Sequence, residues 1–277
     1  MDRLFPRSIR QDQLLIVAIL AIRNEEDYLP NCLSYLMRNG ISFAVIDNGS
    51  TDNSKRIVHS DEFRSGLVRY ELLPFRGNYD WEEILGAKAR VAESLNADWV
   101  IHHDCDEMMH SFEEAETLAD SIGRLDRAGY NAVNFDEFVF LPVNSTFVSD
   151  SIGFPNIRSY YFFHPRNFRL VRAWKPAAKL SNLRSGGHRL TGGDLRLAPE
   201  SLALRHYIFR DQSHAFEKYT SRPFKASEIE RGWHRNRHDK PRERFRFPAP
   251  DQLEWLDSAQ SRRLSRQRPR STHFWDW

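Results

Sequence analysis

Short apolar runs alternate with segments of helical periodicity along the first 140 residues of the chain. The first run, from Leu14 to Ala21, is continuous and rich in Ile, Leu and Val, which is typical of a strand buried on both faces of a parallel sheet. A helical pattern from Asp27 to Arg38 and a second short strand from Phe43 to Ile46 follow it. Further strands are expected at 68–72, 99–102 and 132–141, and helices at 81–94 and 111–128. The alternation predicts an α/β fold with a doubly wound, mostly parallel sheet and helices on both faces.

Polar clusters follow the apolar runs at residues 23–26, 47–52 and 104–107. Because ligands gather at the carboxyl ends of the strands in an open parallel sheet, we expect the three clusters to meet in one crevice. Asp104 and Asp106, separated by one residue, are able to bind one hard divalent cation together with water and two phosphate oxygens. Such a cation stabilises a diphosphate as a leaving group. Asp-x-Asp also occurs in solvated acidic turns, and its position directly after a buried strand favours the cation site.

The segments Ala21-Ile22-Arg23-Asn24-Glu25-Glu26, Asp47-Asn48-Gly49-Ser50-Thr51-Asp52 and Asp104-Cys105-Asp106, in this order and spacing, resemble family 2 glycosyltransferases with the GT-A fold. Arg205-His206-Tyr207, followed by Lys218-Tyr219, is similar to a bacterial branch of that group. The resemblance implies an inverting transfer of a sugar from a nucleotide-diphosphate donor, with UDP favoured. The acceptor hydroxyl would belong to a glycan, a lipid-linked glycan or a protein, as in polysaccharide biosynthesis.

The resemblance also implies where the donor and the metal bind. Asn24 and Glu25 are expected to line the nucleoside, Asp47 to contact the base, and Asp104 and Asp106 to bind Mn²⁺ or Mg²⁺. Asn48 stands where the commonest family pattern has a second Asp, and 47–52 also has the composition of an ordinary capped turn. Lys88 is expected either to contact a phosphate or to be solvated. The full nucleotide-binding set is Ala21, Arg23, Asn24, Glu25, Asp47, Asn48, Gly49, Ser50, Lys88, Asp104 and Cys105.

A third metal ligand, a histidine from the C-terminal part, is implied by the same resemblance. His206, which follows the apolar run from Leu202 to Leu204, is the first choice, and His188 is the second. A neutral imidazole ligand favours Mn²⁺ over Mg²⁺. The residues expected either to close over the diphosphate or to form a solvated basic face are Arg222, Lys225, His234 and Arg237.

Transfer with inversion requires a carboxylate that removes the proton of the acceptor hydroxyl. Asp136 and Glu137 are near the end of an expected strand, and Asp194 follows Gly192-Gly193 in a flexible stretch. Because alternate residues of a strand point to opposite faces, only one of Asp136 and Glu137 is expected to face the crevice. We expect Glu137 to be the base, with Asp136 and Asp194 as alternatives. Each is equally able to be a structural partner of an arginine.

The distribution of charge divides the chain into two halves. Residues 1–150 carry 14 Lys or Arg against 26 Asp or Glu, whereas residues 151–277 carry 26 against 12. The acidic half suits a cation, and the basic half suits phosphates, an anionic acceptor or an anionic lipid surface. We expect a catalytic domain over residues 1–240, with a nucleotide-binding half at about 12–130 and an acceptor half at about 131–240. Residues 241–277 form a basic, aromatic tail whose composition indicates partial disorder.

Other features concern location. Only two cysteines occur, Cys32 and Cys105, and neither belongs to a Cys-x-x-Cys pair, so a disulfide framework and a structural zinc site are not expected. The apolar stretch from Leu14 to Ile22 has nine residues, far fewer than a bilayer span requires. A cytoplasmic protein, in contact at most with the periphery of the membrane, is therefore expected.

Two other functions fit parts of the pattern. A nucleotidyltransferase would also use a doubly wound sheet and paired carboxylates, but the first turn, residues 23–26, lacks the glycine-rich phosphate-binding signature of many such enzymes. A non-catalytic module that binds anions or nucleic acid would use the basic half, with steeply salt-dependent affinity. The arginines and lysines are scattered through apolar strands and do not interleave with a stacking platform, so no nucleic-acid partner is expected.

Overall fold

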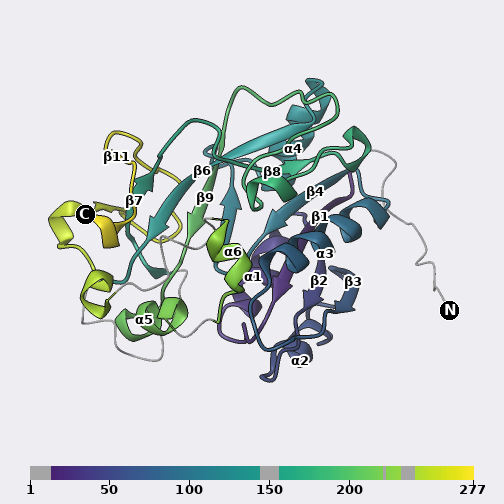
Figure 1. Cartoon of the computed structure of the whole chain (residues 1–277). Helices are drawn as coiled ribbons and strands as arrows, with labels where there is room; N and C mark the ends of the chain where they lie inside the picture. Colours follow the sequence, from purple (N-terminus) through teal and green to yellow (C-terminus); the bar gives the residue numbers. More distant parts are fainter. Residues whose placement is uncertain (1–13, 144–155, 221–222, 232–240) are drawn as a thin grey trace.

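The computed structural model describes residues 14–143, 156–220, 223–231 and 241–277 (Figure 1). One mixed sheet forms its centre, with strands hydrogen-bonded in the order β10-β7-β6-β8-β4-β1-β2-β3; β9 pairs with β5 and β6, and β11 pairs with β7. The strands are β1 Ile16–Ile22, β2 Ser42–Asp47, β3 Leu67–Leu72, β4 Trp99–His103, β5 Glu107–His110, β6 Ala132–Phe140, β7 Ser159–Phe163, β8 Leu170–Trp174, β9 Leu202–His206, β10 Glu254–Trp255 and β11 Pro269–Arg270. The α-helices are α1 Leu29–Arg38, α2 Ser54–Val58, α3 Trp81–Ser94, α4 Leu118–Arg127, α5 Gln212–Thr220 and α6 Ala226–Glu230. No helix among the described residues is long and apolar enough to cross a bilayer.

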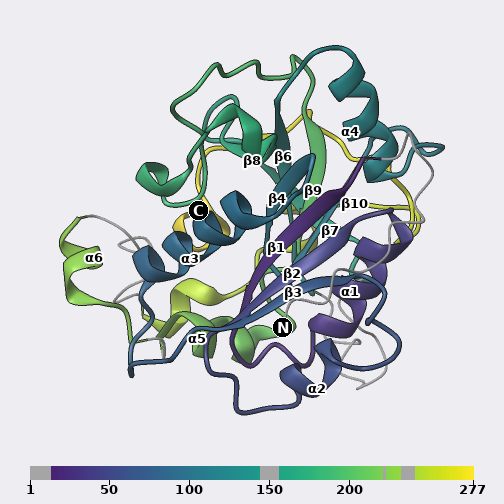
Figure 2. The same ribbon diagram turned by 90° about the vertical axis from the view of Figure 1, so that its right-hand side faces the viewer.

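The N-terminal half of the sheet is parallel and buried on both faces. Strand β1 pairs in parallel with β2 and β4, and β2 pairs in parallel with β3. Residues of β1 alternate between two apolar clusters: Ala18 and Leu20 pack with α1, whereas Val17 and Ile19 pack with α3. Figure 2 shows α1 and α3 on opposite sides of these strands. The continuous apolar run of β1 thus results from burial on both sides, and the predicted α/β fold with helices on both faces is confirmed.

The C-terminal half extends the same sheet with mainly antiparallel pairs. Strand β8 joins the halves, because it pairs antiparallel with β4 on one side and with β6 on the other. Strand β6 also pairs in parallel with β9, which in turn pairs antiparallel with β5. The two halves therefore share one backbone hydrogen-bond network.

Two local expectations were wrong. The helix expected to begin after Ser111 begins at Leu118, because Thr117 is the N-cap: its hydroxyl accepts a hydrogen bond from the Asp120 backbone N–H at 3.1 Å, and the Asp120 carboxylate accepts one from the Thr117 N–H at 3.0 Å. Ser111 instead accepts from the Glu113 N–H within a loop. Strand β5 was not expected, since its four residues begin at the last residue of the polar cluster at 104–107 and are too few to show a period.

The tail at 241–277 is folded, so the expectation of partial disorder was wrong for these residues. Strand β10 pairs antiparallel with β7, and β11 pairs in parallel with the same strand further along. Phe245, Phe274 and Trp275 are buried in a cluster with Tyr161 of β7 and Phe209. The aromatic side chains that the composition placed in the tail provide the apolar area that a disordered segment lacks.

Candidate functional site

A cavity of about 770 Å³ opens where β1 and β4 end and the polar clusters begin. Residues from all three clusters line it, together with residues of β6, β8 and β9, so the clusters predicted to meet do so. The predicted site residues on its wall are Ala21, Arg23, Asn24, Glu25, Asn48, Asp104, Cys105, Asp106, Glu137, His188 and His206. Their binding and catalytic roles stay predictions.

The turn after β2 supports this wall from behind. Asp47 is 1% exposed, and its two carboxylate oxygens accept hydrogen bonds from the Ser50 backbone N–H at 2.7 Å and the Tyr70 hydroxyl at 2.6 Å. The Ser50 hydroxyl accepts from the Asn24 N–H at 3.1 Å, and Gly49 makes the turn with φ +70°. Asp47, Gly49 and Ser50 do not line the cavity; they position Asn24 and the residues beside it.

Arg23 and Asn48 form the surface that this turn presents. Arg23 Nη1 donates to the carbonyl oxygens of Asn48 at 2.9 Å and Gly49 at 2.7 Å, and its guanidinium lies 3.4 Å from the centre of the Phe75 ring. The Asn48 side-chain NH₂ group donates to the Leu73 carbonyl at 3.1 Å. Arg23 is therefore fixed by the backbone and by cation–π contact. The side-chain carbonyl oxygen of Asn48 is left for other partners.

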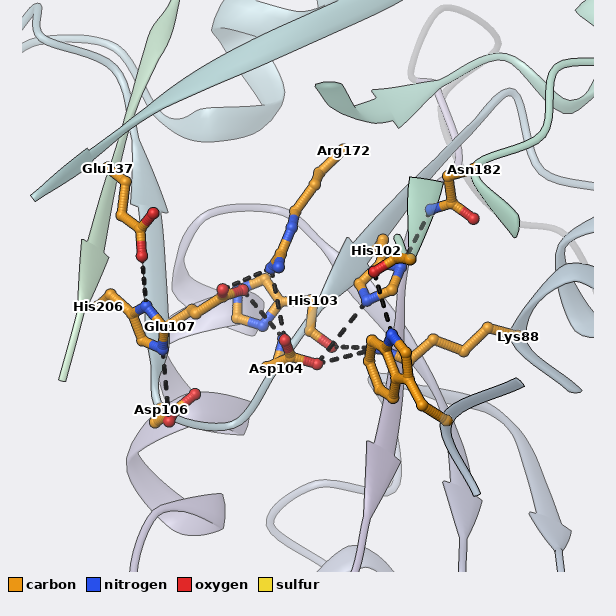
Figure 3. A network of polar contacts seen from close by, with 12 residues as sticks. Lys88, His102, His103, Asp104, Asp106, Glu107, Glu137, Arg172, Asn182 and His206 are labelled. Carbon is orange, nitrogen blue, oxygen red and sulfur yellow. Dashed lines mark hydrogen bonds and ion pairs between the residues drawn. The ribbon is translucent and has the colours of Figure 1, made fainter. Parts of the chain in front are cut away.

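Asp104 is held by two cations from neighbouring elements (Figure 3). Lys88 Nζ on α3 is 3.1 Å from Asp104 Oδ1 and donates to the His103 carbonyl at 2.9 Å, and Arg172 Nη1 on β8 is 3.4 Å from Asp104 Oδ2. Arg172 also donates to Glu107, whose other oxygen accepts from the Asp104 N–H at 3.1 Å. Burial alone would raise the pKa of Asp104, but Lys88 and Arg172 more than offset it and hold that pKa well below its usual range. Asp104 is therefore a carboxylate in a fixed position.

Asp106 begins a second chain of contacts, which runs through His206 to Glu137 (Figure 3). Its Oδ2 lies 2.7 Å from Lys218 Nζ and 3.6 Å from His206 Nε2. His206 Nδ1 donates to Glu137 Oε1 at 2.7 Å, and Arg169 pairs with the other Glu137 oxygen. Burial would lower the pKa of His206, but Asp106 and Glu137 raise it to about 10. The imidazole thus lies between two carboxylates that favour its charged form.

The donor groups of this wall fit a divalent cation in part. Asp106 Oδ2 and His206 Nε2 are close enough for one ion to contact both, since such ions bind these atoms at about 2.1 Å. The bond from Nδ1 to Glu137 would orient His206 with Nε2 toward the ion. Over the described ranges, however, no three His, Cys, Asp or Glu side chains are grouped closely enough to hold a metal ion. Binding through Asp104 as well would require it to exchange Lys88 or Arg172 for the ion.

The other predicted residues have different surroundings. Asp136, next to Glu137 on β6, pairs with Arg266 at 2.8 Å, so of these two neighbours Glu137 is the one on the cavity wall. The Asp194 side chain is 87% exposed, and Lys225 pairs with Asp80 at 2.5 Å; neither lines the cavity. Lys88 contacts Asp104 from the buried side, which removes the alternative of a solvated lysine. Arg222, His234 and Arg237 lie outside the described residues.

Several residues of the wall were missed from the sequence. Arg169 directly precedes β8 and Arg172 lies within it, and both line the cavity. An arginine in a strand of otherwise apolar residues is the sequence signal that could have indicated them. Trp81 begins α3 and stacks on Tyr79 with ring centres 5.9 Å apart, while its indole N–H donates to the Gly186 carbonyl at 3.1 Å. Lys218 belongs to the Lys218-Tyr219 segment of the family resemblance, which predicted no role for its side chain. Spacing alone carries no information about these residues, because they come from separate segments of the chain that only the fold brings together.

Comparison with known proteins gives a partial likeness. No family model matches the chain, and no curated protein sequence matches it. The crystal structure of TarS 1–349 from S. aureus has a TM-score of 0.46 at 13% identity, over 70% of this chain and 60% of that chain. The mannosyltransferase PcManGT from Pyrobaculum calidifontis, in complex with GDP-Man and Mn²⁺, has a TM-score of 0.41 at 15% identity, over 84% of this chain and 66% of that one.

A third structure is more distant. Glucosyl-3-phosphoglycerate synthase from Mycobacterium tuberculosis, in complex with Mn²⁺ and UDP-glucose, has a TM-score of 0.31 at 19% identity, over 45% of this chain and 44% of that chain. The chain spans 60% of the length of TarS 1–349 and 39% of a longer TarS structure. Likeness at this level is restricted to parts of the architecture, so the function has to be inferred from the residues of the site.

Proposed function

We propose that the chain is a metal-dependent glycosyltransferase of the family 2 type with a GT-A fold, which moves a hexosyl or related group from a UDP-sugar to a hydroxyl with inversion. One observation carries the proposal. The three polar clusters, at residues 23–26, 47–52 and 104–107, line one cavity at the carboxyl ends of parallel strands. A cavity in this place, with Asp104 and Asp106 on its wall beside several arginine and lysine side chains, suits a nucleotide bound through its diphosphate.

Asn48 is proposed to contribute to recognition of the base. Its NH₂ group is committed to the Leu73 carbonyl, so its side-chain oxygen is the atom available on the cavity wall. A carbonyl oxygen accepts a hydrogen bond and cannot donate one. It therefore suits a base with an N–H on its pairing edge, as uracil has at N3, and Asp47 supports the turn behind it.

The diphosphate is proposed to lie between the wall of Asp104 and Asp106 and the surrounding cations. A bound Mn²⁺ or Mg²⁺ would supply charge neutralisation of the leaving diphosphate. Lys88 and Arg172 keep Asp104 ionised and fixed, while His206 and Lys218 do the same for Asp106. These contacts hold the carboxylates in position before the donor arrives, which reduces the reorganisation needed on binding.

Glu137 is the proposed acceptor of the proton from the attacking hydroxyl. Burial would raise its pKa, but Arg169 and His206 lower it, so Glu137 is ionised at neutral pH. A lowered pKa weakens a base. The ion pair of Arg169 with Glu137 would therefore have to weaken as the acceptor binds. The position of Glu137 on the wall distinguishes it from Asp136 and Asp194.

The test is a thermal-shift and calorimetric panel of UDP, GDP, ADP and UTP with and without Mn²⁺. We expect stabilisation by UDP that requires Mn²⁺ and that is lost in Asp106→Asn. Asp61→Asn, a matched change at an exposed aspartate paired with Arg64, serves as the control. Equal stabilisation of Asp106→Asn would refute the proposed site. Tighter binding of UTP than of UDP would instead favour nucleotidyl transfer.

A further inference from the structure

A lysine side chain already occupies a cation position in the cavity. Lys218 on α5 places Nζ 2.7 Å from Asp106 Oδ2 and 2.9 Å from the Ile208 carbonyl oxygen. Both side chains of the pair are 12% exposed, and both residues line the cavity. The ammonium group therefore faces the same carboxylate oxygen that lies 3.6 Å from His206 Nε2.

Lys218 differs in placement from the cations that hold Asp104. Lys88 is 5% exposed and does not line the cavity, and Arg172, which does, is 8% exposed and divides its guanidinium between the buried Glu107 and Asp104. Lys218 instead belongs to α5, a helix of the C-terminal part of the chain whose residues line the cavity. Its ammonium is a point charge on a flexible stem with three rotatable donors, so it can turn from one anionic partner to another nearby.

Lys218 and an ion bound between Asp106 and His206 would compete for the same carboxylate oxygen. The ammonium is 2.7 Å from Oδ2, the Asp106 oxygen nearest His206 Nε2, so an ion in contact with Oδ2 and His206 would lie beside a second positive charge in a site that is little exposed. A donor diphosphate brings the negative charge that the displaced ammonium requires. Because an ammonium donates three hydrogen bonds, phosphate oxygens can replace its bond to Asp106.

We propose that Lys218 is an internal stand-in for the divalent cation: it neutralises Asp106 in the donor-free protein, competes with Mn²⁺ for that carboxylate, and turns to the donor diphosphate when the ion binds. This inference rests on the proposed function and assigns to Lys218 a role in diphosphate binding. It makes metal and donor binding mutually reinforcing, since each removes an obstacle to the other.

The test measures the Mn²⁺ affinity and the UDP affinity of a Lys218 variant. A purely structural role of Lys218 would not change these two affinities in opposite directions. In Lys218→Met without nucleotide, we expect Mn²⁺ to bind about tenfold tighter, measured by electron paramagnetic resonance of free Mn²⁺ and by calorimetry. At saturating Mn²⁺, we expect UDP to bind the same variant about tenfold more weakly. Arg210→Gln is the matched control. Arg210 precedes α5 and pairs with Asp27, so this substitution also removes one positive charge but leaves the contacts of Asp106 unchanged.

The outcomes distinguish the inference from the function beneath it. If the unsubstituted protein binds no Mn²⁺ even with UDP present, or if Asp106→Asn binds it equally well, the proposed metal site fails. If that site holds but Lys218→Met binds Mn²⁺ no tighter than Arg210→Gln does, competition by Lys218 is refuted. Unchanged UDP affinity at saturating Mn²⁺ would refute the contact with the diphosphate. Lys218→Gln, which keeps a polar end at this position, provides the same two measurements if the methionine variant does not fold.

Discussion

Arg172 gives the sharpest prediction about stability, because its side chain is 8% exposed and faces two carboxylates. In Arg172→Met, Glu107 remains 1% exposed with the Asp104 N–H as its remaining bond, whereas Asp104 keeps Lys88. Removing one partner of a buried ion pair costs roughly 3–5 kcal/mol. Since Asp104 is partly exposed and keeps a cation, we expect the low end, about 3 kcal/mol, which corresponds to a fall in Tm of roughly 6–12 °C.

The assay is unfolding by urea and by heat at several pH values, with circular dichroism as the signal. Burial already raises the pKa of Glu107 and Arg172 counteracts this, so the variant raises that pKa further. A carboxyl whose folded pKa is raised loses stability as pH rises through that value, so the deficit should be smaller at pH 5 than at pH 8.

Two comparisons make this result decisive. The double variant Arg172→Met, Glu107→Met should recover most of the loss, because a buried ion pair replaced by apolar side chains of similar volume is often neutral. Arg69→Met, at a half-exposed ion pair with Glu71, should cost less than about 1 kcal/mol. A loss below about 1 kcal/mol in Arg172→Met, or a double variant no more stable than the single one, would refute the reasoning.

Three further predictions concern the site and its surroundings. Glu137→Gln should abolish transfer while Mn²⁺ affinity, measured by calorimetry, changes less than about threefold, because the glutamine oxygen can still accept the bond from His206 Nδ1; normal transfer would refute Glu137 as the base. His206→Ala should weaken Mn²⁺ binding by roughly tenfold or more and His188→Ala by much less, and the reverse ranking in a titration would transfer the ligand role to His188. Contacts with Arg124 and Ser121 lower the pKa of Glu116 to about 2, so its contribution to stability is present above pH 4.5 and is lost as pH falls toward 2. Glu116→Gln should therefore lower Tm at pH 7 and converge with the unsubstituted protein near pH 2, and an equal difference at both pH values would contradict this.

The fold could be predicted where the pattern was local. The apolar run of β1 and the helical period of α3 were each found from spacing, and α3 spans the expected residues 81–94. The start of α4 was missed because Ser111 and Thr117 are both good N-caps, and the choice between them depends on Asp120 reaching back to the Thr117 N–H. The tail was misjudged because its aromatic side chains are buried only against Phe209 and β7, far earlier in the sequence.

The candidate site was predictable as a place and only partly as a set of contacts. Polar clusters at strand ends located Asn24, Asp104 and Asp106 on one wall, because parallel strands end at a common edge. The pairing of Asp104 with Arg172 and of Asp106 with Lys218 was not predictable, since each joins residues at least 68 positions apart. Alternation along β6 predicted that only one of Asp136 and Glu137 faces the cavity, whereas the contacts of Glu137 with Arg169 and His206 required the structure.

The C-terminal tail covers an edge of the sheet and also contributes to the cavity. Strands β10 and β11 together cap the outer side of β7, and His273, three residues beyond β11, stacks on Phe163 of that strand and lines the cavity. Shortening the chain at residue 240 would thus uncover backbone donors and acceptors that attract other strands, and it would open one side of the binding chamber. Sequence changes in this segment therefore bear on aggregation and on ligand access at once, although it contains none of the motif residues.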